Sequence, residues 1–447
     1  MIDMIWLGRL GSNTVAAVGT AGFFLWLGIS VLLTTKVGTE IGVSQAVGKK
    51  NKGLLIQTIS NAFFLVFTGA ISLGALFYLI APDLIGFFNL KESEINYTAV
   101  SYLRIISTGA LFYFSNPTIS AVFNGVGNSK TPFMINSIGL ITNIILDPIL
   151  IFGFGPFPKM GANGAAWATI FSQSIVFLLL WLNFNENHLP VKRKDIFLFP
   201  DSKILLKITK LGAPVAAQSS LFAIFAMIIA RITARWGAIP IAVLNIGAQI
   251  EALSWMTASG FATALGTFTG QNFGAKFWNR IRKGFRIGTI ISASTGAAVT
   301  ALFFFFGKPV FSLFIAEPDT LIMGTNYLHI LAWSQIFMCL EITTSGAFYG
   351  IGRTLPPSLL GTIFTGLRIP LALLLSQPDF LDLQGIWWAL SISSVFKGMI
   401  SFSWFNLITK YHPDIMPRTA NPKGFVQLIP TRIRQQIIGV QKLRSNS

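Results

Sequence analysis

The sequence predicts an all-α membrane protein built from two six-helix lobes that are related by an internal repeat. Of the 447 residues, 53% are hydrophobic and 11% are charged, whereas soluble domains carry roughly 25% charged residues. Apolar runs of about 20 residues, each long enough to cross a bilayer, recur along the chain. The two halves also share residues at an almost constant spacing. Together these observations favour a polytopic helical protein over a string of soluble domains.

The predicted helices are apolar runs that end at connections rich in glycine, proline or charged residues. In chain order they cover 14–47, 54–80, 96–123, 132–154, 163–184, 204–233, 240–272, 285–306, 320–349, 355–376 and 385–409. The one long polar connection divides the chain into an N-terminal lobe at 1–184, a linker at 185–203, a C-terminal lobe at 204–409 and a basic tail at 410–447.

The repeat matches residues of the two lobes in the same order. The pairs are Arg9 with Arg235, Gly11 with Gly237, Ala16 with Ala242, Gln45 with Gln271, Gly48 with Gly274, Gly125 with Gly350, Gly127 with Gly352 and Pro132 with Pro357. Each copy spans an even number of helices, so both copies run in the same direction through the membrane. Parallel repeats of this kind are typical of secondary transporters, which hold their substrate at the repeat interface.

Positive charges gather in alternate connections, as in Lys49, Lys50 and Lys276, and in the tail. The positive-inside rule therefore places these connections, the linker and the C-terminal tail in the cytoplasm, in a multi-pass protein of the cell membrane. We therefore attribute the net charge of +17 to the orientation of the protein in the membrane and to contact with lipid headgroups, and we expect no nucleic-acid partner. We expect the protein to be a monomer.

The N-terminus departs from the repeat. The second copy has a full helix, 204–233, before its turn at 234–237, whereas the first copy has only residues 1–7 before the matching turn. These residues read as the end of a further apolar helix. We therefore expect the first helix to be mostly missing here and translation to begin upstream of Met1, which would complete six helices in each lobe.

Eight motifs in chain order resemble the MATE (multidrug and toxic compound extrusion) transporters. They are DMIWLGRLG at 3–11, AAVG at 16–19, SQAVG at 44–48, NIILDPILIF at 143–152, GANGAAWAT at 161–169, IEALS at 250–254, GQNFGA at 270–275 and LRIPL at 367–371. The resemblance implies two six-helix lobes around a central cavity. It also implies export of organic cations and related amphipathic compounds in exchange for H⁺ or Na⁺, without a nucleotide or other cofactor.

Acidic residues inside the apolar helices are the first candidates for a functional site, because a buried charge in a bilayer costs at least about 2.5 kcal/mol. Asp147 lies roughly 10 Å below the outer end of its helix, and Asp3 and Thr169 reach a similar depth. Asn143 lies one turn before Asp147 on the same helix face. We predict that these four residues bind Na⁺ or a proton, and the resemblance implies the same four positions. The alternative is that Asn143 and Asp147 only stabilise the kink at Pro148.

The C-terminal lobe is expected to differ. Glu251 and Glu341 are candidates for a second ion site, although Glu251 is equally suited to hydrogen bonding between helices. Arg368 occupies the position equivalent to Asn143, so this lobe is not expected to repeat the first site. Lys36 and Glu40, four residues apart on one helix, favour a buried ion pair.

Two other functions compete with transport of organic cations. A flippase for lipid-linked sugars or polyprenyl lipids, from the same superfamily, would share the two lobes but line its cavity with several basic residues. The basic residues expected to lie within the membrane are only Lys36, Arg104, Arg231, Arg368 and Lys397. An enzyme is disfavoured, because the histidines are isolated and no nucleophile or metal cluster emerges. The single cysteine, Cys339, excludes disulfides and thiolate metal sites.

Overall fold

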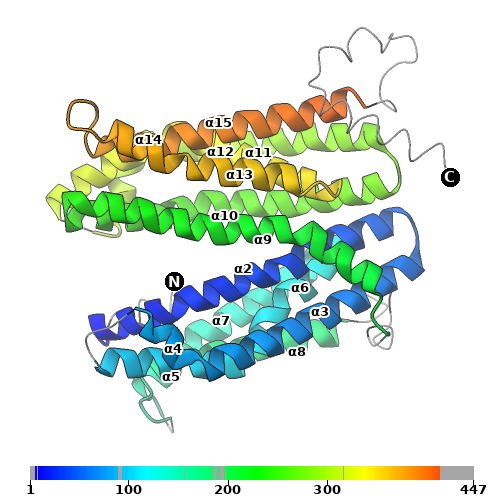
Figure 1. Cartoon of the computed structure of the whole chain (residues 1–447), viewed down its shortest axis with the longest axis horizontal. Helices are drawn as coiled ribbons and strands as arrows, with labels where there is room; N and C mark the ends of the chain where they lie inside the picture. Colours follow the sequence, from blue (N-terminus) through cyan, green and yellow to red (C-terminus); the bar gives the residue numbers. More distant parts are fainter. Residues whose placement is uncertain are drawn as a thin grey trace.

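The computed structural model describes residues 6–7, 9–88, 93–155, 157–184, 189, 191, 196, 198–315 and 317–412, which form helices and turns without a strand. Figure 1 shows these helices as two elongated bundles that lie side by side. The N-terminal bundle contains α2 (Ser12–Gly48), α3 (Lys52–Leu79), α4 (Ala81–Gly86), α5 (Ser93–Thr108), α6 (Ala110–Val126), α7 (Lys130–Phe152) and α8 (Ala162–Leu182).

The C-terminal bundle starts with α9 (Ser202–Thr233), which a 3₁₀ turn, η2 (Ala234–Trp236), joins to α10 (Ala238–Gly274). It continues with α11 (Trp278–Ser312), α12 (Pro318–Gly350), α13 (Leu355–Gly366), α14 (Arg368–Leu375) and α15 (Gln384–Lys410). The predicted all-α membrane fold with two lobes is confirmed. Eight of the described helices are long and apolar enough to cross a membrane.

Three predicted helices differ from the structure in their course. The segment at 96–123 is divided into α5 and α6 at Gly109, and the segment at 355–376 is divided into α13 and α14 at Leu367. The helix expected at 285–306 is longer, because α11 begins at Trp278 and carries basic residues in its first turns. Residues 1–5, most of the linker and the chain beyond 412 lie outside the described residues, so the expectations about them stay predictions.

Each lobe has its own apolar core. In the N-terminal lobe, buried side chains of α2, α3, α5, α6 and α8 form two clusters, and in the C-terminal lobe the largest cluster joins α9, α10, α11, α12, α14 and α15. A small cluster of Val37, Ile41 and Val215 joins the lobes, because α2 packs along α9. The lobes are thus two packed units that meet along α2, α9 and α10.

The lobes also approach each other closely where α2 and α10 end. A Cβ atom on Gly48 would overlap the backbone carbonyl of Gln271, and one on Gly274 would overlap that of Gln45. Gln45 Nε2 donates a hydrogen bond to the Gly350 carbonyl oxygen at 3.0 Å. This contact between residues 44–50 and 270–276 is called the closed end below.

The same contact is made a second time with the lobes exchanged. Gln271 Nε2 donates to the Gly125 carbonyl oxygen at 3.1 Å. Since the repeat pairs Gln45 with Gln271 and Gly125 with Gly350, the closed end is reciprocal. The exposed residues Lys49 and Lys276 flank it, so it lies on the side of the basic connections. Toward the other ends of α2 and α10 the lobes diverge (Figure 1).

Candidate functional site

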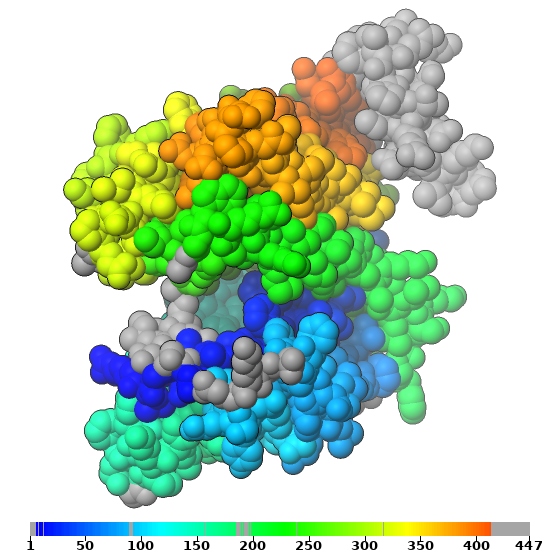
Figure 2. All heavy atoms as spheres, turned by 60° about the vertical axis from the view of Figure 1, so that its left-hand side comes forward, coloured from blue at the N-terminus to red at the C-terminus, as the bar shows by residue number. Residues whose placement is uncertain are grey.

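A cavity of about 850 Å³ lies between the lobes. Figure 2 shows the hollow between the N-terminal and the C-terminal lobe from the divergent end. The N-terminal lobe lines it with α2, and the C-terminal lobe with α9, α10, α12, α14 and α15. Apolar side chains such as Trp26, Phe222, Trp255 and Met256 form much of its wall. A cavity of this size and polarity suits an amphipathic organic molecule.

Six charged residues line the cavity, three of each sign. They are Lys36, Glu40, Glu251, Glu341, Arg368 and Lys397. At neutral pH their formal charges sum to zero, so the cavity is neither a purely acidic site for cations nor a purely basic site for anions. How these charges are paired therefore decides what the cavity can bind.

Lys36 and Glu40 do not form the buried ion pair that their spacing favoured. They interact electrostatically, but no salt bridge joins them among the described residues, and both line the cavity. Each is only partly buried in the protein. The helical spacing places Lys36 and Glu40 on one face of α2, and that face borders the cavity. The two side chains therefore have room to stay apart and need not form a salt bridge.

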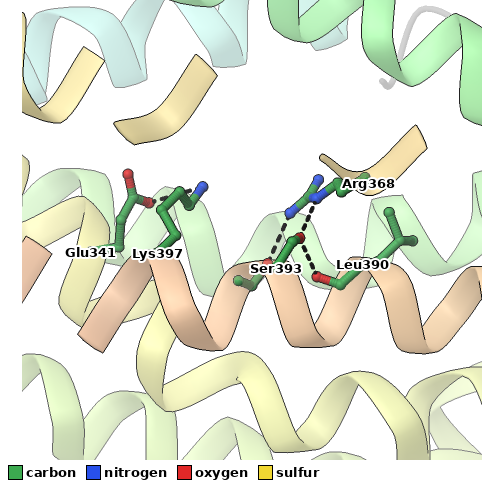
Figure 3. Close-up of polar contacts among 6 residues, drawn as sticks. Glu341, Arg368, Leu390, Ser393 and Lys397 are labelled. Carbon is green, nitrogen blue, oxygen red and sulfur yellow. Dashed lines mark hydrogen bonds and ion pairs between the residues drawn. The ribbon is translucent and has the colours of Figure 1, made fainter. Parts of the chain in front are cut away.

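Glu341 has a direct partner. Its Oε2 lies 3.4 Å from Lys397 Nζ, and both side chains are largely buried (Figure 3). The carboxylate predicted as part of a second ion site is thus already neutralised by a lysine of the neighbouring helix α15. A cation that binds Glu341 would have to displace this ammonium group.

Glu251 and Arg368 are held in a different way. Gln335 Nε2 donates to Glu251 Oε1 at 3.0 Å, which bears out the expected hydrogen bonding between helices. Arg368 donates from Nε to Ser393 Oγ at 2.7 Å and from Nη2 to Ser394 Oγ at 2.8 Å. Glu251 and Arg368 interact electrostatically, yet Glu251 accepts its hydrogen bond from a neutral amide and Arg368 donates its hydrogen bonds to neutral hydroxyl groups.

The predicted ion site lies in the N-terminal lobe, apart from this cavity. Asp147 is fully buried on α7, and Asn143 Nδ2 donates to its Oδ1 at 3.1 Å. The structure therefore brings together the two residues that the helical spacing had paired. None of the six charged residues of the cavity belongs to this pair, so the pair lies apart from the cavity lining.

Thr169 lies on α8, which packs antiparallel to α7. A Cβ atom on Gly139 would meet Val176, and one on Gly164 would meet the backbone of Leu150. These close approaches bracket Thr169 on α8 and Asp147 on α7, which supports the predicted common depth. Thr169 Oγ1 is buried and has no hydrogen-bond partner among the described residues. Asp3 lies outside the described residues.

Sequence reasoning missed the partners that hold the cavity charges. Gln335, Ser393 and Ser394 were not singled out, although polar side chains inside apolar helices usually have a partner. The serines of α15, which follow one another within an apolar run, were the available signal. The roles of Gln45 and Gln271 were also missed, although the repeat had matched them.

Three comparisons place this chain among known proteins. The sequence model of the MatE family matches residues 1–149 and 214–374. The chain is 29% identical over 409 residues to the probable multidrug resistance protein NorM of Thermotoga maritima, covering 91% of this chain and 87% of the relative. It is 27% identical over 416 residues to the probable multidrug resistance protein YoeA of Bacillus subtilis, covering 92% and 89% of the two chains.

The fold is also similar to solved structures. One is an outward-facing conformation of a multidrug resistance MATE family transporter, with a TM-score of 0.84 and 21% sequence identity, covering 91% of this chain and 90% of that one. Another is a MATE protein in complex with MaD3S, with a TM-score of 0.85 and 22% identity, over 92% and 91% of the two chains. At these identities the likeness concerns the fold.

Proposed function

The chain belongs to the MATE family of transporters, and from this we propose that it is a multidrug efflux antiporter. It exports organic cations and related amphipathic compounds and takes H⁺ or Na⁺ in exchange. The observation that carries the proposal is the cavity between the lobes, closed at one end and lined by apolar and charged side chains. As a MATE protein the chain is a transporter and not an enzyme.

The proposed coupling site is the buried pair of Asn143 and Asp147, together with Thr169 and Asp3. Carboxylate, amide and hydroxyl oxygens are hard ligands that suit Na⁺, and the carboxylate can bind a proton instead. The separation of this site from the cavity supports an exchange in which ion and substrate occupy different places. The ion and the substrate must then each bind one of two conformations of the protein more tightly than the other conformation. Binding of the ion therefore weakens binding of the substrate, and the reverse.

The proposed transport cycle moves the lobes as two bodies between two states. The reciprocal contact at the closed end supports this, because it can break without unfolding either apolar core. The basic residues beside it, Lys49 and Lys276, favour the cytoplasmic side. We therefore infer an outward-facing monomer in the cell membrane, with the 185–203 linker and the C-terminal tail in the cytoplasm.

Transport across the membrane of sealed vesicles that contain the purified protein tests this function. Efflux of a fluorescent organic cation is measured while a proton gradient and a sodium gradient are imposed separately. We expect one gradient to drive uphill movement and the other to have little effect. If neither gradient drives transport, and if affinity for the dye is indifferent to pH and to Na⁺, the antiport proposal is wrong.

A flippase for lipid-linked sugars is the second candidate, because Lys36, Arg368 and Lys397 place three basic residues on the cavity wall. The three cavity carboxylates oppose it, since they would repel a phosphate-linked lipid. Movement of a fluorescent polyprenyl-phosphate sugar across the vesicle bilayer, with no movement of the organic cation, would favour the flippase.

A further inference from the structure

The two cations of the C-terminal lobe wall differ in what they bind. Lys397 is paired with the carboxylate of Glu341. The Arg368 guanidinium is bound by the hydroxyl groups of Ser393 and Ser394, and no salt bridge joins it to an acid among the described residues (Figure 3). Hydroxyl groups fix its position but leave its charge uncompensated at short range.

The acid that interacts most strongly with Arg368, Glu251, is hydrogen-bonded to another side chain. Glu251 receives its hydrogen bond from Gln335, a fully buried side chain of α12, and interacts with Arg368 only at longer range. A guanidinium and a carboxylate that are free to move would form a bidentate pair. Here neutral neighbours hold the two opposite charges apart on one cavity wall.

Arg368 retains donors for a ligand. A guanidinium has five N–H groups, and the serines accept from Nε and from one position on Nη2. The remaining N–H groups, on Nη1 and Nη2, match the two oxygens of a carboxylate. Arg368 lines the cavity, so these donors belong to the wall that a substrate meets. A cation that forms no salt bridge within the described part of a bilayer-spanning lobe is costly, which favours a functional reason for keeping it.

We propose that Arg368 binds an anionic group on the substrate, so that the cavity selects amphipathic zwitterions carrying a carboxylate as well as a cationic group. The carboxylate binds the guanidinium, and the cationic group lies toward Glu251. The apolar body packs on residues such as Phe222, Trp255 and Met256. This inference rests on the proposed function, since it names the substrate class of the same cavity.

The competing explanation is that Arg368 serves only to neutralise Glu251. The two explanations differ in what happens when the positive charge is removed. A counter-ion acts on all substrates alike, or even opposes cations by repulsion, whereas an anion-binding group acts on substrates that carry an anion. Selectivity between two matched ligands therefore separates them, and overall activity does not.

Equilibrium binding to the full-length protein in lipid nanodiscs tests the proposal with two probes. A zwitterionic carboxyrhodamine and its methyl ester share one dye cation and differ in the carboxylate. We expect the wild-type protein to bind the acid about tenfold more tightly than the ester, a ratio that corresponds to one charge-assisted hydrogen-bonded contact. Arg368→Gln should bring this ratio close to one and leave affinity for the ester unchanged or higher.

Further variants show whether a change comes from the site or from misfolding. Arg368→Lys keeps the positive charge but lacks the planar guanidinium group that can bind both oxygens of a carboxylate. The double variant Ser393→Ala with Ser394→Ala leaves the guanidinium free to move. Each of these two changes should lower the preference for the acid over the ester in part. Arg104→Gln removes an arginine of α5 that is not part of the cavity lining and should leave the ratio unchanged. Retained binding of the ester shows that a variant is folded.

The proposal is overturned if the wild-type protein does not prefer the acid, or if Arg368→Gln weakens the acid and the ester equally. If Arg368→Gln does not fold, an Arg368→Lys ratio equal to that of the wild type overturns it as well. Because these measurements use no ion gradient, they can fail while gradient-driven efflux succeeds, and the reverse also holds.

Discussion

The two lobes share one repeat, yet their polar interiors are built differently. In the N-terminal lobe, the Asp147 carboxylate is buried next to the neutral amide of Asn143. In the C-terminal lobe, the position matching Asn143 holds Arg368, and the carboxylate of Glu341 is paired with Lys397. The Glu341 carboxylate thus already has a cationic partner within the protein. The difference between the lobes fits the proposal that the N-terminal lobe couples to the ion and the C-terminal lobe meets the substrate.

Where the lobes touch, however, they are alike. Gln45 and Gln271 each bind a backbone carbonyl of the opposite lobe, and Gly48 and Gly274 each allow a close backbone approach. This contact must form and break once in each transport cycle. Because its two halves are equivalent, the hydrogen bonds from both lobes can break in the same step. Binding sites gain from asymmetry, because ion and substrate need different ligands.

The largest expected effect is at the N-terminal lobe carboxylate. Asp147→Asn should lower gradient-driven export at least about 100-fold, because an amide cannot change its charge when the ion binds and leaves. The measurement is efflux from vesicles under the gradient that drives the wild-type protein, with dye binding as the test of folding. Asp83→Asn, at an exposed residue of α4, is the matched control and should export normally. Wild-type export by Asp147→Asn would make Glu341 the better coupling candidate.

The pair in the C-terminal lobe should respond as a structural pair. Glu341→Gln leaves the Lys397 ammonium without its carboxylate and should reduce the free energy of unfolding by about 3 kcal/mol. Adding Lys397→Gln should restore most of that loss. Thermal unfolding in detergent checks both, with Glu40→Gln, which breaks no salt bridge, as the comparison. A stable Glu341→Gln protein that no longer exports would instead assign an ion-coupling role to Glu341.

The symmetric contact should be weakened by adding one methyl group. Gly48→Ala introduces a Cβ atom that overlaps the Gln271 carbonyl, which costs about 2 kcal/mol and shifts the balance away from the closed end about 30-fold. Spin labels on Lys49→Cys and Lys276→Cys should then report a longer distance. The native Cys339 is buried, so it should label poorly.

A glycine with open space around it provides the control for that experiment. Gly260→Ala, in the same long helix as Gly274, adds a Cβ atom that meets nothing within 4 Å. It should leave the distance between the labels as in the wild-type protein. If Gly48→Ala also leaves it unchanged, close approach at this glycine does not hold the lobes together.

The smallest expected effect is at the neutral ligand of the ion site. Asn143→Ala removes one amide but keeps the Asp147 charge, so the concentration of ion that half-activates export should rise about tenfold. The maximal export rate should be nearly preserved at saturating ion. Equal losses for Asn143→Ala and Asp147→Asn would indicate that the pair only supports the kink at Pro148.

The amino-acid sequence alone determined the helical membrane fold, the two lobes and the residues that match between them. It also paired Asn143 with Asp147 correctly, because a spacing of four residues within one helix is a local property. These features depend on hydrophobicity and helical period, which short segments carry by themselves. The break at Leu367 and the full extent of α11 were not visible in the same way.

Only the tertiary structure decided how the cavity charges are paired. The helical spacing favoured a salt bridge between Lys36 and Glu40, whereas the structure joins Lys397 to Glu341 and leaves Arg368 on two serines. These contacts join α12, α14 and α15, whose relative rotation depends on packing between distant segments. The closed end likewise needs both lobes, because Gln45 and Gln271 find their acceptors only across the interface. Long-range packing selects these partners, and no single helix encodes it.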